Sequence, residues 1–139
     1  MTIKKVFGEL TNKELWEIAI LRSSVFTIEQ NIKENELEEL DYKAIHYFIK
    51  KNNVVVSYAR VIQENEKIKL GRVCTKLDYR GQGLQTKIIR TIIDEHKEVE
   101  LSAQIQTISF YQTLGFETIG DIYLEANIKH QRMIIKVGE

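Results

Sequence analysis

The chain has 139 residues, 43% of them hydrophobic, which is enough for a packed core of ordinary domain size. Twenty basic side chains balance twenty acidic ones, which argues against a nucleic-acid or membrane-surface protein. No apolar run approaches the ~20 residues of a membrane helix, and no signal-peptide pattern follows Lys4 and Lys5. The single cysteine, Cys74, excludes an intrachain disulfide and fits a reducing compartment. We therefore expect one cytoplasmic domain over residues 1–139, with no membrane or nucleic-acid partner.

The first predicted elements are a short strand over residues 3–7 and a helix. Thr11 and Glu14 have the capping-box spacing, in which the threonine oxygen accepts an N–H and the glutamate reaches back. Apolar residues then recur at helical spacing as far as Val25. The acidic segment 33–41 is irregular, and we expect a second short helix within it.

A β-hairpin is predicted next. Strands over residues 45–51 and 54–62 flank Asn52-Asn53, and asparagine tolerates the left-handed backbone that a tight turn requires. A second turn at residues 64–66 leads into another strand over 67–75.

The C-terminal half alternates helices and strands. Apolar residues on one face predict a helix over 84–96. A strand over 99–103 and a helix over 107–114 follow, and Gly115 is a natural end for that helix. Two last strands are expected, over roughly 116–124 and 131–137. This order predicts an α/β fold (α+β, with a mixed sheet) in which a central mixed β-sheet is flanked by helices.

The most informative segment is the turn between the strand 67–75 and the helix 84–96. It places Gly81 and Gly83 beside Arg80 and Thr86, and the N–H groups of such a helix start can bind a phosphate. The spacing excludes a P-loop, and Thr86 stands where the dinucleotide fingerprint needs a third small residue. An anion site of another type is indicated, and a turn that merely reverses the chain is the alternative.

Two motifs and the element order resemble the GNAT superfamily of N-acetyltransferases. Gly71–Gly83 is similar to that family's central strand and its Arg/Gln-x-x-Gly-x-Gly/Ala loop, and Phe110–Phe116 is similar to its Tyr-x-x-x-Gly-Phe helix end. A narrower resemblance, to the ElaA-like branch, rests on four further segments. These are Arg22–Gln30, Asp41 with His46, Ala103-Gln104 and His130–Met133.

The resemblance implies a GNAT-like acyl-CoA N-acyltransferase fold, acetyl-CoA as cosubstrate and an amine as acceptor. The backbone of Val73 and Thr75 would pair with the pantetheine arm, and Gln104 would bind a pantetheine amide. The pyrophosphate would lie on Arg80, Gly81, Gln82, Gly83, Leu84, Gln85 and Thr86. Gln85 stands where the family usually has Gly or Ala, so its side chain must point away from the phosphates. Leu77 stands where the family often has a proline.

The same resemblance suggests catalytic and acceptor-binding residues. Tyr111 matches the position that protonates the departing CoA thiolate. Glu29 and His130 are candidates for handling the amine's proton. The acceptor-binding candidates are Arg22, Phe26, Glu29 and His46.

Each candidate also has a purely structural interpretation. Tyr111 could be a core aromatic, Glu29 a surface carboxylate, and each histidine a structural hydrogen-bonding group. Trp16 is most simply a core or pocket-wall residue. Cys74 is best interpreted as a small buried residue. Three histidines and one cysteine without ligand spacing predict no metal site.

Three functions therefore remain open. The first is direct acetyl transfer from acetyl-CoA to a primary amine of a small molecule or peptide. The second is a catalytically silent CoA-binding module. The third, suggested by Arg22-x-x-x-Phe26, is an enzyme like the acyl-homoserine-lactone synthases. The sequence does not identify the acceptor, and a homodimer is only a default expectation.

Overall fold

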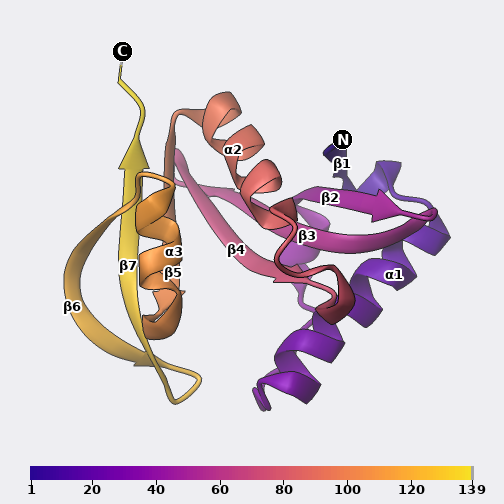
Figure 1. Cartoon of the computed structure of the whole chain (residues 1–139), viewed down its shortest axis with the longest axis horizontal. Coiled ribbons are helices and arrows are strands. Elements are labelled where there is room, and N and C mark those ends of the chain that lie inside the picture. The colour runs from indigo at the N-terminus through magenta and orange to yellow at the C-terminus, as the bar shows by residue number, and fades with distance from the viewer. Residues whose placement is uncertain (139) are drawn as a thin grey trace.

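The computed structural model describes residues 1–138 and contains a seven-stranded sheet of order β1-β2-β3-β4-β5-β7-β6 (Figure 1). The strands are β1 (Ile3–Val6), β2 (Ile45–Lys51), β3 (Val54–Glu64), β4 (Lys67–Thr75), β5 (Glu98–Gln104), β6 (Glu117–Glu125) and β7 (Ile128–Lys136). All neighbouring strands are antiparallel except β4 and β5, which are parallel. The predicted mixed sheet is therefore confirmed.

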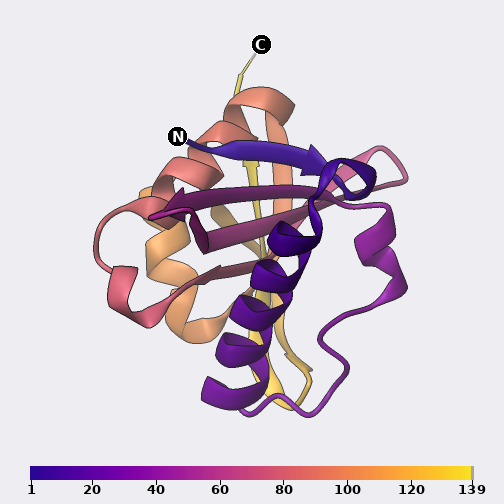
Figure 2. The same cartoon turned by 90° about the vertical axis from the view of Figure 1, so that its right-hand side faces the viewer.

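Helices cover the sheet on both faces. Helix α1 (Asn12–Arg22) continues as a π-helix over Ser23–Glu29, while α2 (Leu84–His96) and α3 (Ile108–Thr113) lie on the opposite face (Figure 2). The predicted capping box begins α1, since Glu14 N donates to Thr11 Oγ1 at 3.0 Å and Thr11 N donates to Glu14 Oε1 at 2.9 Å. Short 3₁₀ helices lie at Phe7–Glu9, Glu39–Tyr42, Leu77–Tyr79 and Ile105–Thr107.

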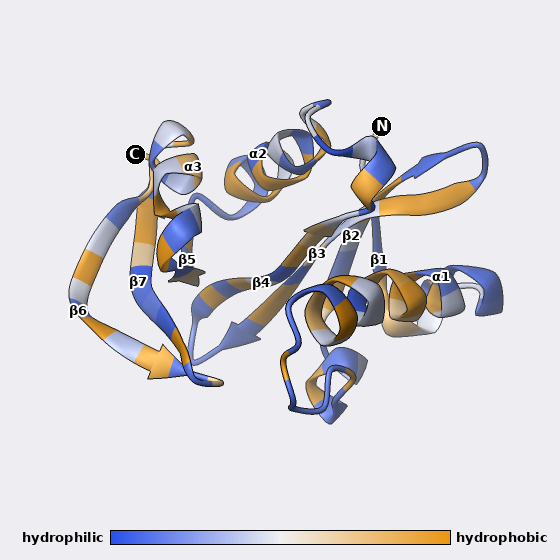
Figure 3. Ribbon diagram, turned by 60° about the horizontal axis from the view of Figure 1, so that its bottom comes forward, coloured by the Kyte–Doolittle hydropathy of each residue, from blue (hydrophilic) through white to orange (hydrophobic). Residues whose placement is uncertain are grey.

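Strand alternation divides the apolar side chains into two clusters. On β2, Phe48 packs with α1, whereas Tyr47 and Ile49 pack on the α2 side. The central strands β2 and β3 and helix α1 are accordingly rich in apolar residues (Figure 3). The expectation that Trp16 lies in the core or in a pocket wall is wrong. It is 69% exposed, because α1 turns Ile18 toward the sheet and Trp16 away from it.

Strands β4 and β5 pair at only two positions. Their register joins Lys69 to Glu100 and Leu70 to Leu101, and no pairing follows toward their C-terminal ends. Figure 1 shows the two strands together at one end and apart at the other. A β-bulge accompanies the separation. Arg72 has a φ of 51°, and it and the next residue oppose Ala59 alone. The sheet is therefore open along the edge of β4 that faces β5.

A buried ion-pair network holds the segment 31–42 against the sheet. Arg22, only 1% exposed, binds Glu36 through Nε at 2.7 Å and Asp41 through Nη1 at 2.7 Å. Arg60 also binds Asp41, at 3.0 Å, and Arg72 binds Glu36, at 2.8 Å. The network fixes an irregular segment that contributes few apolar contacts of its own.

Asp41 makes the stability of this network depend on pH. Burial alone would raise the pKa of Asp41, but hydrogen bonds from Arg22, the backbone N–H of Glu38 and Arg60 outweigh it and lower the pKa to about 2. A carboxyl group whose pKa is lowered by folding stabilises the fold at pH values above its ordinary pKa. That stabilisation is lost as the pH falls through the pKa of the folded state.

Asp41→Asn should therefore lower the free energy of unfolding at pH 7 by about 2 kcal/mol, and the difference from wild type should shrink as the pH falls from 4 to 2. Urea unfolding at a series of pH values measures both effects. Asp121→Asn, at an exposed position on β6, is the matched control and should unfold like wild type. A constant difference across that pH range would contradict the prediction.

Candidate functional site

A cavity of about 690 Å³ lies along the face of the sheet that α2 and α3 do not cover. Its floor comes from β3, β4, β5 and β7, and its walls come from the π-helix with the following segment and from the β6–β7 hairpin. Many of its charged and amide side chains lie on the floor strands, at Arg60, Glu64, Lys69, Arg72, Glu100, Gln104 and Arg132.

The gap between β4 and β5 opens into this cavity. Gly71, Arg72 and Val73 line it from β4, and Ser102–Gln104 line it from β5. These residues begin immediately after the last paired row, Leu70 with Leu101. Their backbone has no strand partner across the gap, so an extended ligand with amide groups can pair there as an added strand.

The glycine turn follows β4 directly and adopts the backbone that its composition predicts. Gly81 and Gly83 have φ values of 79° and 78°, and Gly83 is the N-cap residue of α2. The N–H groups of the first helical turn have no partner within the helix, and the helix dipole adds positive potential there. Gln85 and Thr86 lie in that first turn and are half-buried.

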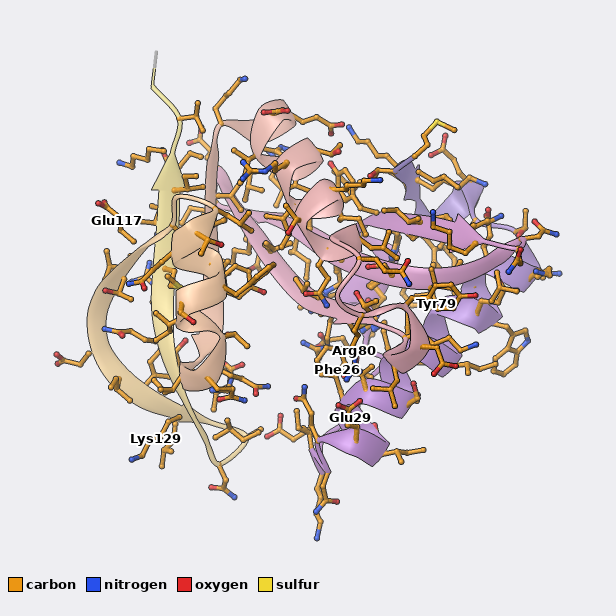
Figure 4. All side chains as sticks on the ribbon, in the orientation of Figure 1. Phe26, Glu29, Tyr79, Arg80, Glu117 and Lys129 are labelled. Atoms are coloured by element: carbon orange, nitrogen blue, oxygen red, sulfur yellow. The ribbon has the colours of Figure 1, made fainter. Side chains whose placement is uncertain are left out.

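Arg80 is held in place by two neighbours. Its Nε donates to Thr75 O at 2.8 Å, and its Nη1 and Nη2 bind the Glu29 carboxylate at 2.9 and 2.7 Å. Figure 4 shows Glu29 and Arg80 side by side below the turn. The hydrogen bonds from Arg80 lower the pKa of Glu29. Glu29 is therefore a weak proton acceptor while this pair is intact, and neither residue lines the cavity.

Tyr111 reaches the cavity from α3. Its ring is 8% exposed and packs edge-on against Phe110 and Phe116. Burial, with a smaller effect of Cys74, raises the pKa of the Tyr111 phenol, so it is protonated at neutral pH. The core and site interpretations of Tyr111 are compatible, because the packed ring fixes a hydroxyl at the cavity wall.

Several predicted site residues are not brought to the cavity. Arg22 is occupied by Glu36 and Asp41. His46 is 2% exposed, with Nδ1 2.6 Å from Tyr58 Oη and Nε2 3.0 Å from Asp41 O. Burial lowers the pKa of His46, which keeps the ring neutral. In this structure both residues support the wall rather than face a ligand.

Phe26, Gln104 and His130 do line the cavity. Gln104 donates to Gln30 Oε1 at 2.8 Å, which joins β5 to the end of the π-helix. His130 is opposite Gln104 in the β5–β7 register. The three predicted residues therefore come from distant parts of the chain and meet at one site.

Other lining residues were not singled out from the sequence. Arg60 and Arg72 supply cations to the cavity, and Ser102 and Glu125 lie beside His130. Arg60 could have been identified from the sequence. It lies inside the apolar run of β3, and an arginine there must have buried partners. No local pattern marks Glu125, which sits at an exposed strand end.

No helix among residues 1–138 is both long and apolar enough to span a membrane. Within the same residues, no cluster of three or more His, Cys, Asp or Glu side chains could hold a metal ion.

Comparison with known proteins agrees with the geometry. The family model described as "Acetyltransferase (GNAT) domain" matches residues 13–137. The chain belongs to the GNAT acetyltransferase family. Among curated relatives, the UPF0039 protein C11D3.02c of Schizosaccharomyces pombe is 32% identical over 144 residues, which cover 97% of this chain and 96% of that protein.

Two solved structures share the complete fold. Escherichia coli ElaA is 30% identical, has a TM-score of 0.87, and the match covers 98% of this chain and 99% of that one. An acyl-CoA N-acyltransferase from Pseudomonas aeruginosa is 26% identical with a TM-score of 0.89, and the match covers 97% and 99% of the two chains. The resemblance to the ElaA-like branch is therefore confirmed, and this GNAT protein has the acyltransferase fold.

The left-handed backbone of Gly83 yields a test of the turn. A Cβ at this position meets no atom within 4 Å, so Gly83→Ala introduces only backbone strain, of about 1–2 kcal/mol. If the turn relieves that strain by shifting its N–H groups, the Kd for CoA should rise about tenfold. Isothermal titration calorimetry measures the Kd. Gly8→Ala, which has equal space but no positive φ, should leave it unchanged.

Proposed function

We propose that this protein transfers the acetyl group of acetyl-CoA directly to a primary amine. The observation that carries the proposal is the gap between the parallel strands β4 and β5. It exposes unpaired strand edges and opens into a cavity lined by Tyr111. Membership of the GNAT acetyltransferase family supports acyl transfer, and this gap indicates where an acyl-CoA would lie.

Each part of acetyl-CoA has a complementary part of the protein. The pyrophosphate fits the N–H groups of Gly81–Thr86 at the start of α2. The pantetheine amides fit the free edge of β4 at Val73 and Thr75, with Gln104 across the gap. Arg80 can bind a phosphate once it exchanges Glu29 for that phosphate, and the guanidinium suits either anion.

The chemistry requires no covalent enzyme intermediate. Cys74 is fully buried, and burial raises the pKa of its thiol, so it is a poor nucleophile. A neutral amine held beside the thioester can attack the carbonyl carbon directly, and holding the two reactants together removes several kcal/mol of the barrier. Backbone N–H groups at the Arg72–Val73 bulge can stabilise the oxyanion.

We assign the proton for the departing thiolate to Tyr111. A phenol with a raised pKa is a weak acid in water, but the water-excluded site that raises its pKa also makes the thiolate more basic. A hydrogen bond from Tyr111 Oη to the sulfur, strengthening as the C–S bond breaks, is therefore a suitable source of that proton.

The alternative functions find less support. The interpretation as a lactone synthase rests on Arg22 and Phe26. However, Arg22 is buried and forms ion pairs with Glu36 and Asp41. A catalytically silent CoA-binding module would need no hydroxyl at the cavity wall beside the gap. It would bind CoA tightly and release no thiol with any amine.

The proposal predicts that Tyr111→Phe lowers kcat about 10²–10⁴-fold and leaves the Kd for CoA within about twofold, because only the acid is removed and the ring packing remains. The measurement is release of CoA thiol with a panel of primary amines, together with calorimetric CoA binding.

Tyr42→Phe removes the same atom from a tyrosine that is 66% exposed and does not line the cavity, so its kcat should match wild type. An unchanged kcat in Tyr111→Phe would remove Tyr111 from the acid role. Absence of thiol release by the wild type with every amine would favour the silent module.

A further inference from the structure

His130 has one ring nitrogen engaged and the other available. Nδ1 lies 2.7 Å from Ile128 O, and a carbonyl can only accept, so Nδ1 carries the proton and Nε2 carries the lone pair in the neutral ring. Among residues 1–138, Nε2 makes no hydrogen bond. The side chain is 7% exposed on β7, lines the cavity, and stacks on Tyr123 with ring centroids 6.1 Å apart.

A carboxylate lies beside this lone pair. Glu125 Oε2 is 3.8 Å from His130 Nε2, across the β6–β7 hairpin. Its other oxygen accepts a hydrogen bond from Ser102 Oγ at 3.3 Å, and Ser102 also contacts the hydroxyl of Tyr123. Three strands thus hold two acceptors, an imidazole lone pair and a carboxylate oxygen, side by side at the cavity wall.

In the neutral ring, the Nε2 lone pair and the Glu125 carboxylate repel each other until a proton lies between them. We propose that the ammonium of the acceptor substrate brings this proton: it docks between His130 Nε2 and Glu125 and gives a proton to His130. The inference rests on the acetyl transfer proposed above, and it identifies the ligand as a protonated primary amine. Glu125 is the binding and positioning carboxylate, and His130 is the catalytic base.

The remaining charges on the cavity wall fit the same ligand. Each cation that lines it is already paired with a carboxylate. These pairs are Arg60 with Glu38, Lys69 with Glu64, Arg72 with Glu36, and Arg132 with Glu100. Glu125, in contrast, has no arginine or lysine within ion-pair distance among the described residues. The wall therefore favours an ammonium and offers no free cation to a carboxylate on the acceptor.

The proton balance is complete without another reactant. R–NH₃⁺ gives one proton to His130 Nε2, and Glu125 stabilises the resulting imidazolium. The neutral amine then forms the C–N bond, the C–S bond breaks, and the thiolate takes the Tyr111 proton. The new amide nitrogen loses its second proton, which restores Tyr111, and His130 releases its proton to water. The net products are an amide, free CoA and one proton.

The test compares two acceptors of almost the same shape, butylamine and O-propylhydroxylamine, which differ by one CH₂ replaced by oxygen. Butylamine is protonated at pH 7, as a lysine amine with a pKa of about 10 is, whereas the hydroxylamine is neutral. His130→Gln should lower kcat about 10²–10³-fold with butylamine and less than about tenfold with the hydroxylamine, because a neutral amine needs no base.

Glu125→Gln should raise the KM of butylamine about two- to fivefold, as expected for a partly exposed ion pair. It should leave the KM of O-propylhydroxylamine unchanged, and Glu125→Asp should recover part of the butylamine effect. Glu117→Gln is the control, because it removes the same charge from β6 at an exposed position whose side chain projects outward (Figure 4). It should behave like wild type with both acceptors.

The outcomes separate the two proposals. Wild-type transfer to both acceptors, with equal losses for both in His130→Gln, would overturn the ammonium site and leave acetyl transfer standing. No transfer to any primary amine would overturn both. A measurement on the folded wild type needs no variant. ¹⁵N NMR of its three histidines should show one with a protonated Nδ1 and an unprotonated Nε2 that shifts on adding butylamine with CoA. A protonated Nε2 in the free protein would contradict the proposal.

Discussion

The separation of β4 from β5 is the constraint on which the rest of the structure depends. Parallel strands normally satisfy each other's backbone groups along their whole length, but here only two rows are paired. The unpaired edges cost free energy unless water or a ligand satisfies them. A long apolar core under α2 and α3 continues across both halves of the sheet, and it compensates for the missing pairs. The gap is therefore maintained by packing on one face and opens into the cavity on the other.

The cavity also requires a wall opposite the β6–β7 hairpin. Ion pairs, and not apolar contacts, hold this wall in place. Three arginines and three carboxylates form a network of matched charges beneath the segment 31–42. Burying ions is favourable only when every group has partners, and Arg60 Nε is left without one among residues 1–138. Such a network adds less to stability than an apolar core would, but it fixes one geometry for the segment. The same charges leave the wall with no spare cation.

The sequence predicts features whose causes are local. The capping box of Thr11 and Glu14, the Asn52-Asn53 turn and the left-handed glycines depend on neighbours within a few residues, and the structure has them all. The roles of Arg22, Glu29 and His46 depend on partners 5 to 51 residues away. A residue type that suits a ligand also suits a buried ion pair, and only the three-dimensional structure shows which partner is present.

The half of the site assigned to acetyl-CoA and the half assigned to the acceptor also differ in how far the sequence predicts them. The half assigned to acetyl-CoA consists largely of backbone groups, on the edge of β4 and at the start of α2, and backbone conformation leaves a glycine pattern that can be read in a sequence. The half assigned to the acceptor consists of side chains from β5, β6, β7 and the π-helix, brought together by the sheet order. Glu125 and His130 are five residues apart in the chain, yet their proximity depends on the hairpin register and on Ser102 from a third strand. A site made of backbone groups therefore leaves a pattern that one sequence can reveal, whereas the pairing of Glu125 with His130 emerges only from the assembled strands of the cavity.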